Sequence, residues 1–188
     1  MLSYMDSLNK IKIFKSFLNA EEYNHVLNEL FHNGQWEFGW RSDYNNKCMP
    51  PFWRRDLYDD AYYSEYLKNK IEQVCGKRFH CRRVYANAKT YGQDGDYHTD
   101  GENDEDNIIE YTFCLYITPL KNNEKNVIGG ELQFKLPELD DEIYELNVLC
   151  HPNLGVLFPA HFKHRGMAYK RYTHELRICI AWKLKEIK

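Results

Sequence analysis

Hydrophobic residues recur at helical spacing in two segments near the start of the chain, residues 18–31 and 64–76. The apolar face of the first segment is formed by Tyr23, Val26, Leu27, Leu30 and Phe31. Asn19 precedes this face and Glu22 follows three residues later, which is the spacing of a capping box. Gly76 stands where the second segment should end. The pattern predicts two amphipathic helices.

The segment between the two helices, residues 35–56, shows neither a helical nor a strand period. It holds three of the four tryptophans and two consecutive prolines. We therefore expect a long ordered loop, and loops of this length commonly pack on the core or cover a site.

Short apolar runs separated by turn residues take over after residue 78. These runs cover residues 80–88, 110–118, 129–135, 142–149, 155–159 and 175–185, and a further one covers residues 10–14. Helices followed by strands are typical of the α+β class. The sequence predicts a β-sandwich or jelly-roll barrel backed by the N-terminal helices.

The composition indicates one globular domain over residues 1–188, with helical support and a loop in 1–77 and the jelly-roll core in 78–188. Of the 188 residues, 43% are apolar and 15% aromatic, which argues against disorder. The net charge of −3 argues against a general polyanion binder but leaves room for a local basic patch. The six cysteines form no Cys-x-x-Cys pair, and we find neither a secretory signal nor a membrane span. We expect a cytoplasmic protein with no membrane partner.

The stretch "YHTDGENDED", residues 97–106, carries the first candidate chemistry. In an extended segment His98 and Asp100 project to the same side, as two metal ligands on one strand do. An isolated His-x-Asp is usually a strand end, so a third ligand is needed from elsewhere in the chain. "GVLFPAHFKHRG" offers two, His161 and His164.

Two histidines and one carboxylate, with other positions open, form the facial ligand set of non-haem Fe(II) oxygenases. Such a site leaves room for a chelating 2-oxo acid and for dioxygen. It also needs a forked cation for the distal carboxylate of the co-substrate. Arg177 fits that role, because strand alternation places it on the same face as the small residues Cys179 and Ala181.

The order of "HTD", "GGELQF", "GVLFPAHFKHRG" and "RICIAW" resembles the Fe(II)/2-oxoglutarate-dependent dioxygenase superfamily, within it the prolyl 4-hydroxylase-like branch. The resemblance implies a double-stranded β-helix. It places the distal histidine five residues after the Phe-Pro pair, and so implies Fe(II) on His98, Asp100 and His164. It also implies 2-oxoglutarate on Arg177, with dioxygen as the second co-substrate and ascorbate as a further candidate cofactor.

The same resemblance implies that Tyr116 helps to hold the co-substrate and that Tyr91 is a second pocket tyrosine. One departure is His174, which stands where the branch commonly has its basic residue. Lys170 and Arg171 are therefore alternatives to Arg177. We prefer Arg177 because it begins an apolar-alternating strand.

The resemblance favours hydroxylation of an amino-acid side chain, prolyl 4-hydroxylase-like, on a peptide or protein. The alternatives are a free amino acid or small-molecule hydroxylase, an AlkB-type nucleic-acid demethylase, and a catalytically silent binding module. The cluster of Trp53, Arg54 and Arg55 could stack bases and favours the demethylase. The absence of a second arginine shortly after Arg177 argues against it, so nucleic acid is the less favoured partner.

An acidic run follows Asp100 and contains Glu102, Asp104, Glu105 and Asp106. If these carboxylates frame the entrance of the site, they repel a phosphate backbone. The run then predicts a cationic or neutral substrate.

Overall fold

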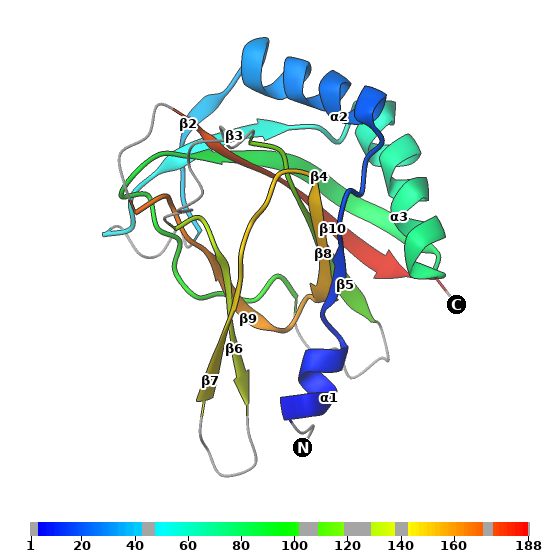
Figure 1. Cartoon of the computed structure of the whole chain (residues 1–188), viewed down its shortest axis with the longest axis vertical. Helices are drawn as coiled ribbons and strands as arrows, with labels where there is room; N and C mark the ends of the chain where they lie inside the picture. The colour runs from blue at the N-terminus through cyan, green and yellow to red at the C-terminus, as the bar shows by residue number, and fades with distance from the viewer. Residues whose placement is uncertain are drawn as a thin grey trace.

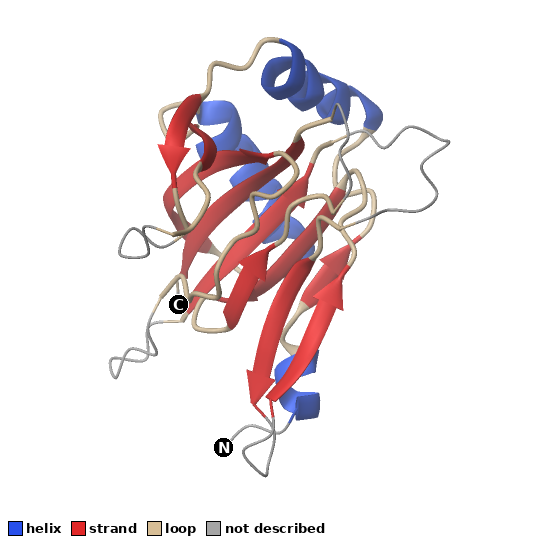
Figure 2. Ribbon diagram, turned by 90° about the vertical axis from the view of Figure 1, so that its left-hand side faces the viewer, coloured by secondary structure: helices blue, strands red, loops and turns tan. Residues whose placement is uncertain are grey.

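Two antiparallel sheets and a layer of helices make up the chain, as Figures 1 and 2 show. The computed structural model describes residues 4–42, 48–101, 109–118, 129–137, 143–170 and 175–187. The α+β class and the jelly-roll arrangement with supporting helices are as the sequence predicts.

The larger sheet has seven strands in the order β1-β8-β5-β10-β4-β3-β2. Its strands are β1 (Lys12–Phe14), β2 (Glu37–Trp40), β3 (Phe52–Asp56), β4 (Phe79–Lys89), β5 (Glu110–Tyr116), β8 (Leu154–Pro159) and β10 (Arg177–Glu186). The long strands β4 and β10 pair along ten positions near the middle of the sheet. They form a rigid base on which side chains can be placed.

The smaller sheet has three strands in the order β7-β6-β9. These are β6 (Leu132–Pro137), β7 (Ile143–Val148) and β9 (Lys163–Gly166). A buried cluster that includes Phe134, Phe158 and Phe162 fills the space between the two sheets at one end. A polar cavity borders this cluster, and members of the cluster such as Tyr116 and Cys179 line it.

The helices are α1 (Tyr4–Asn9), α2 (Ala20–Leu27) continued by the π-helix η1 (Asn28–His32), and the π-helix η2 (Tyr62–Leu67) continued by α3 (Lys68–Cys75). The predicted capping box is confirmed, because the Asn19 side chain accepts from the Glu22 amide and the Glu22 side chain accepts from the Asn19 amide. Gly76 ends α3 in the left-handed conformation that glycine favours.

The second core lies between the helices and the outer face of the larger sheet. Strand alternation supplies one side of it with Val84, Ala86, Ala88, Phe113, Leu115, Ile178, Ile180 and Trp182. The helices supply the other side with Val26, Leu30, Tyr63, Leu67 and Ile71. The opposite residues of β4, β5 and β10 are therefore turned toward the smaller sheet.

The expectation of a loop over residues 35–56 is wrong for two parts of that segment. β2 and β3 pair with each other, and β3 continues the sheet beyond β4. The strand period is hidden because one face of β3 meets the helix-side core while the other meets a polar cavity, so neither face contrasts clearly with the other. Within the described residues, no helix is long and apolar enough to cross a bilayer.

Candidate metal and co-substrate site

A short backbone pairing joins the segment after β4 to strand β9 at the site. The amide of His98 donates to the carbonyl of His164 at 3.0 Å, and the amide of His164 donates back at 2.9 Å. The amide of Asp100 donates to the carbonyl of Ala160 at 2.8 Å. These bonds fix the segment after β4 against β9 and hold three side chains at one point.

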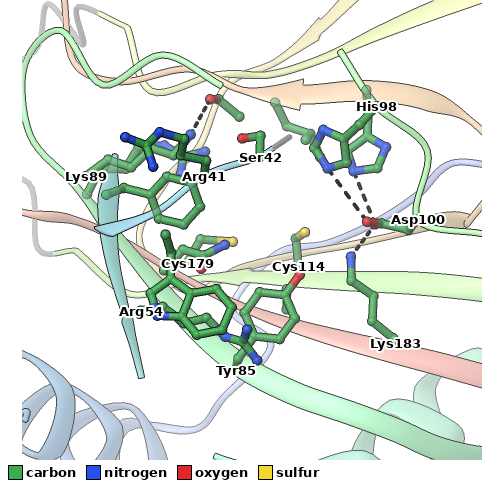
Figure 3. A pocket seen from close by; sticks show the side chains of 18 of the residues that line it. Arg41, Ser42, Arg54, Tyr85, Lys89, His98, Asp100, Cys114, Cys179 and Lys183 are labelled. Carbon is green, nitrogen blue, oxygen red and sulfur yellow. Dashed lines mark hydrogen bonds and ion pairs between the residues drawn. The ribbon is translucent and has the colours of Figure 1, made fainter. Parts of the chain in front are cut away.

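His98, Asp100 and His164 form a compact group of candidate ligands. One ligand atom from each lies within 4.8 Å of the other two. The Oδ1 atom of Asp100 is 3.7 Å from Nε2 of His98, and its Oδ2 atom is 3.2 Å from Nε2 of His164. Figure 3 shows His98 and Asp100 at one side of the cavity.

Both imidazoles are oriented through their other nitrogen. Nδ1 of His98 lies 2.9 Å from the carbonyl oxygen of Asp96, and Nδ1 of His164 lies 2.8 Å from that of Phe162. A proton on Nδ1 satisfies each carbonyl and leaves the Nε2 lone pair for a metal, as is usual for metal-binding histidines.

The charge states also suit metal binding. Burial and the nearby His164 lower the pKa of His98 to about 4, so its imidazole is neutral at physiological pH. Burial opposes ionisation of Asp100, but Lys183 and the two histidines outweigh it and hold the pKa of the carboxyl well below its usual range. The group therefore offers a carboxylate and at least one neutral imidazole, and it fits a divalent metal with open positions.

His161 is not part of this group. It lines a separate cavity with residues of β1 and α3, and its ring packs edge-on to Phe162. Of the two histidines that the sequence left as alternatives, the structure brings His164 to Asp100.

Arg177 lies in the same cavity as the candidate ligands. Its side chain is buried, with Nε donating to the carbonyl oxygen of Gly130 at 2.8 Å and the guanidinium 5.1 Å from the centre of the Tyr116 ring. Gly130 has a positive φ of 81°, a conformation that favours glycine, and lies two residues before β6 begins. The hydroxyl of Tyr116 is buried and has no hydrogen-bond partner among the described residues.

Lys89 is a second buried basic side chain beside Arg177, and the sequence pattern did not predict it. Its ammonium donates to the carbonyl oxygen of Gly166 at 2.9 Å. Burial and the positive charge of Arg177 lower its pKa to about 7. The buried Arg177 lies beside a lysine that is only partly protonated at neutral pH, with Asp94 as the nearby carboxylate. An anionic ligand at this end of the cavity would be stabilised by Arg177 and would favour the charged form of Lys89.

Lys183 was not predicted as a site residue either, although the alternation of residues along β10 indicates it. The face that holds Arg177 continues through Cys179 and Ala181 to Lys183, whose ammonium contacts the carboxylate of Asp100. The hydroxyl of Thr112 donates to the same carboxylate at 2.6 Å. Extending the alternation by two residues would have found Lys183.

Several other predicted positions lie away from the cavity or outside the described residues. The structure does not bring Tyr91 to the site, because it sits in a turn before Gly92 and is 58% exposed. Lys170 is exposed. Arg171, His174 and the acidic run (Glu102, Asp104, Glu105 and Asp106) lie outside the described residues.

The predicted basic and aromatic cluster is divided between the two faces of β3. Arg54 lines the cavity. Trp53 packs against the helix-side core, and Arg55 pairs with Glu29 at 2.6 Å. The cluster therefore does not form one surface on which bases could stack.

The chain shares its fold with solved oxygenases, although no protein-family model matches its sequence and the comparison with curated proteins gave no match. It is similar to a 2OG-Fe(II) oxygenase family oxidoreductase from Burkholderia pseudomallei, with a TM-score of 0.67 and 11% identity over 94% of this chain and 85% of that one.

Two prolyl hydroxylases are similar to this chain in fold to about the same extent. One, from Trichoplax adhaerens in complex with a hypoxia inducible factor peptide fragment, has a TM-score of 0.66 and 15% identity over 93% of this chain and 83% of its own. A prolyl-4-hydroxylase from Pseudomonas putida has a TM-score of 0.63 and 16% identity over 93% and 91% of the two chains. At these identities the likeness shows the fold, which is that of 2-oxoglutarate-dependent oxygenases.

Proposed function

We propose that the protein is an Fe(II)- and 2-oxoglutarate-dependent oxygenase. The observation that carries the proposal is the presence, in one cavity of about 330 Å³, of His98, Asp100, His164 and the buried Arg177. A facial set of two imidazoles and a carboxylate suits Fe(II) and keeps positions open. A buried guanidinium suits one end of a dicarboxylate.

In this proposal His98, Asp100 and His164 hold the metal, while Thr112 and Lys183 hold the carboxylate of Asp100 in place. Bound Fe(II) supplies dioxygen activation, coupled to conversion of 2-oxoglutarate into succinate and carbon dioxide.

The distal carboxylate of 2-oxoglutarate binds Arg177, with the unpartnered hydroxyl of Tyr116 as a second donor. Cys179 and Ala181 share the cavity face of β10 with Arg177, and their small side chains leave room for the co-substrate. Tyr91 has no part in this arrangement, because it is exposed.

The reaction we propose is hydroxylation of an amino-acid side chain, with a prolyl residue of a peptide or protein as the leading target. The similarity to two prolyl hydroxylases supports this target. A free amino acid or small molecule is the alternative, and the modest cavity volume suits it equally. The divided Trp53, Arg54 and Arg55 cluster counts against a nucleic-acid demethylase.

The test is turnover of 2-oxoglutarate by the purified protein with Fe(II), dioxygen and ascorbate. We expect succinate to form, and peptides or free amino acids in the same mixture to gain the mass of one oxygen atom. The Asp100→Ala variant should form no succinate above the protein-free background. Succinate formation that is equal in the wild type and in this variant would reject the proposal.

A further inference from the structure

The cavity is lined by more cationic side chains than Asp100 and bound 2-oxoglutarate would pair with. Among the described residues that line it, the cations are Arg41, Arg54, Arg83, Lys89, Arg177 and Lys183, and the carboxylate is Asp100. Lys183 contacts Asp100, and Lys89 and Arg177 lie together at the co-substrate end. Three arginines remain, which are Arg54 on β3, Arg83 on β4 and Arg41 directly after β2.

Arg54 is held between two aromatic rings. Its guanidinium carbon lies 4.0 Å from the ring centre of Trp40 and 4.4 Å from that of Tyr85. Stacking of this kind fixes the guanidinium plane without using its N–H donors. Figure 3 shows Arg54 and Tyr85 on the wall below Cys179 and Cys114, and Asp100 to one side.

Two buried polar atoms on this wall have no partner among the described residues. They are Nε of Arg54 and Oδ1 of Asn87, and their residues are directly opposite each other in the pairing of β3 with β4. Buried polar atoms without partners are rare in folded proteins. The N–H of Arg54 needs an acceptor whereas the amide oxygen of Asn87 needs a donor, so of the two only Arg54 suits an oxyanion. Arg54 also donates to Asp56, whose side chain is 65% exposed, but this bond uses Nη2 and leaves Nε without a partner.

Positive charge continues around Tyr85. The guanidinium carbon of Arg83 lies 5.4 Å from the ring centre. A wall with this charge attracts anions and repels cations. The expectation of a cationic or neutral substrate came from the acidic run, which lies outside the described residues, and the described wall favours the opposite charge.

We infer that the substrate carries an oxyanion, a carboxylate or an equivalent acid group, that binds the fork of Arg54 while the carbon to be oxidised faces the metal site. The inference rests on the proposed function and names the substrate class of that site. The acid group could belong to a small molecule or to an acidic residue of a peptide, and the experiment separates these two sources.

The test measures binding by calorimetry to protein loaded with Mn(II) and saturated with 2-oxoglutarate, so that Arg177 is already occupied and no turnover occurs. The first pair of probes is N-acetyl-L-proline and its amide. The second pair is acetyl-Glu-Pro-amide and acetyl-Gln-Pro-amide. Each pair differs in one carboxylate and keeps nearly the same shape.

We expect the acid of at least one pair to bind about tenfold tighter than its neutral partner, since a fork-to-carboxylate contact is charge-assisted and bidentate. A preference in the first pair assigns a small acid, and one in the second pair assigns an acidic peptide. Arg54→Met should abolish the preference and Arg54→Lys should keep only part of it. Arg55→Met is the matched control, because Arg55 lies on the opposite face of β3, and it should keep the full preference.

Three results would overturn the inference: equal affinity within both pairs, no binding of any probe, or a preference that survives Arg54→Met in protein whose melting temperature is unchanged. The proposed function is judged separately by the affinity for 2-oxoglutarate in the same protein. If 2-oxoglutarate binds with Mn(II) and the probes show no preference, the oxygenase proposal stands and only the substrate inference fails. If 2-oxoglutarate does not bind, the oxygenase proposal itself fails.

Discussion

The ammonium of Lys183 contacts the carboxylate of Asp100, although the two residues are 83 positions apart in the chain. Both side chains are buried, at 10% and 5% exposure. The Lys183 ammonium also lies 3.3 Å from the hydroxyl of Thr112, which donates to the same carboxylate. In metal-free protein Lys183 thus balances the buried negative charge of Asp100. In metal-bound protein the proposed metal would balance that charge as well.

This pair predicts that Lys183→Met destabilises the metal-free protein more than the metal-bound protein. Removing one partner of a buried ion pair leaves an uncompensated charge, and we expect a loss of about 3 kcal/mol in the free energy of unfolding. Urea denaturation with a chelator and with Mn(II) measures both states. Lys185→Met, further along β10, is the control and should have a small effect in both. Equal losses with and without metal would show that Asp100 is not a ligand.

The ligand assignment makes a second prediction. Replacing His98, Asp100 or His164 by alanine should each reduce Fe(II) binding from near equimolar to almost none. His161→Ala should bind iron as the wild type does, because His161 lies in a different cavity. Equilibrium dialysis under anaerobic conditions gives the metal content of all four variants. Loss of iron in His161→Ala but not in His164→Ala would reverse the assignment.

The role of Arg177 predicts a change in the KM for 2-oxoglutarate. Arg177→Lys keeps one charge but loses the planar fork and the bond from Nε to Gly130. We expect KM to rise at least about tenfold, which corresponds to about 1.4 kcal/mol. Lys170→Met should leave KM unchanged, because Lys170 is exposed. The opposite result in these two variants would transfer the role to Lys170.

The parts of the site that could be predicted from the sequence are those with a fixed spacing. His98 and Asp100 share one side of an extended segment, and the alternation of β10 assigned Arg177, Cys179 and Ala181 to one face, where the structure has them. The distance between His98 and His164 could not be derived in this way, because it depends on a backbone pairing between β9 and the segment that follows β4.

The position of Arg54 in the cavity was harder to predict from the sequence. Strand periodicity is visible when one face is apolar and the other is polar, but β3 carries an aromatic residue and an arginine on each face. Phe52 and Arg54 turn to the cavity, while Trp53 and Arg55 turn to the helices. Without the partner strand β4, the sequence gives no reason to separate Arg54 from Arg55.

The last prediction concerns Lys89 and the dependence of stability on pH. Burial and the neighbouring Arg177 lower the pKa of Lys89 from 10.5 to about 7, against the opposing effects of Asp94 and Cys179. Between pH 7 and 10 the unfolded chain therefore holds a proton on this residue that the folded protein lacks. Stability rises with pH wherever the unfolded state binds more protons, so the penalty that the buried Lys89 imposes on folding is relieved progressively across this range.

The comparison that isolates this effect is wild type against Lys89→Met, by urea denaturation of metal-free protein at several pH values. We expect the wild-type free energy of unfolding, relative to the variant, to rise by about 1 kcal/mol per pH unit between pH 7.5 and 9.5, below the limit of about 1.4 kcal/mol for one proton. Below about pH 6 the difference should become constant, because Lys89 is then protonated in both states. Saturating 2-oxoglutarate should flatten the rise, since its carboxylate stabilises the charged ammonium. Parallel curves for the two proteins from pH 7.5 to 9.5 would mean that Lys89 stays charged in the folded protein, and Lys89 would then add a full positive charge to Arg177 at neutral pH.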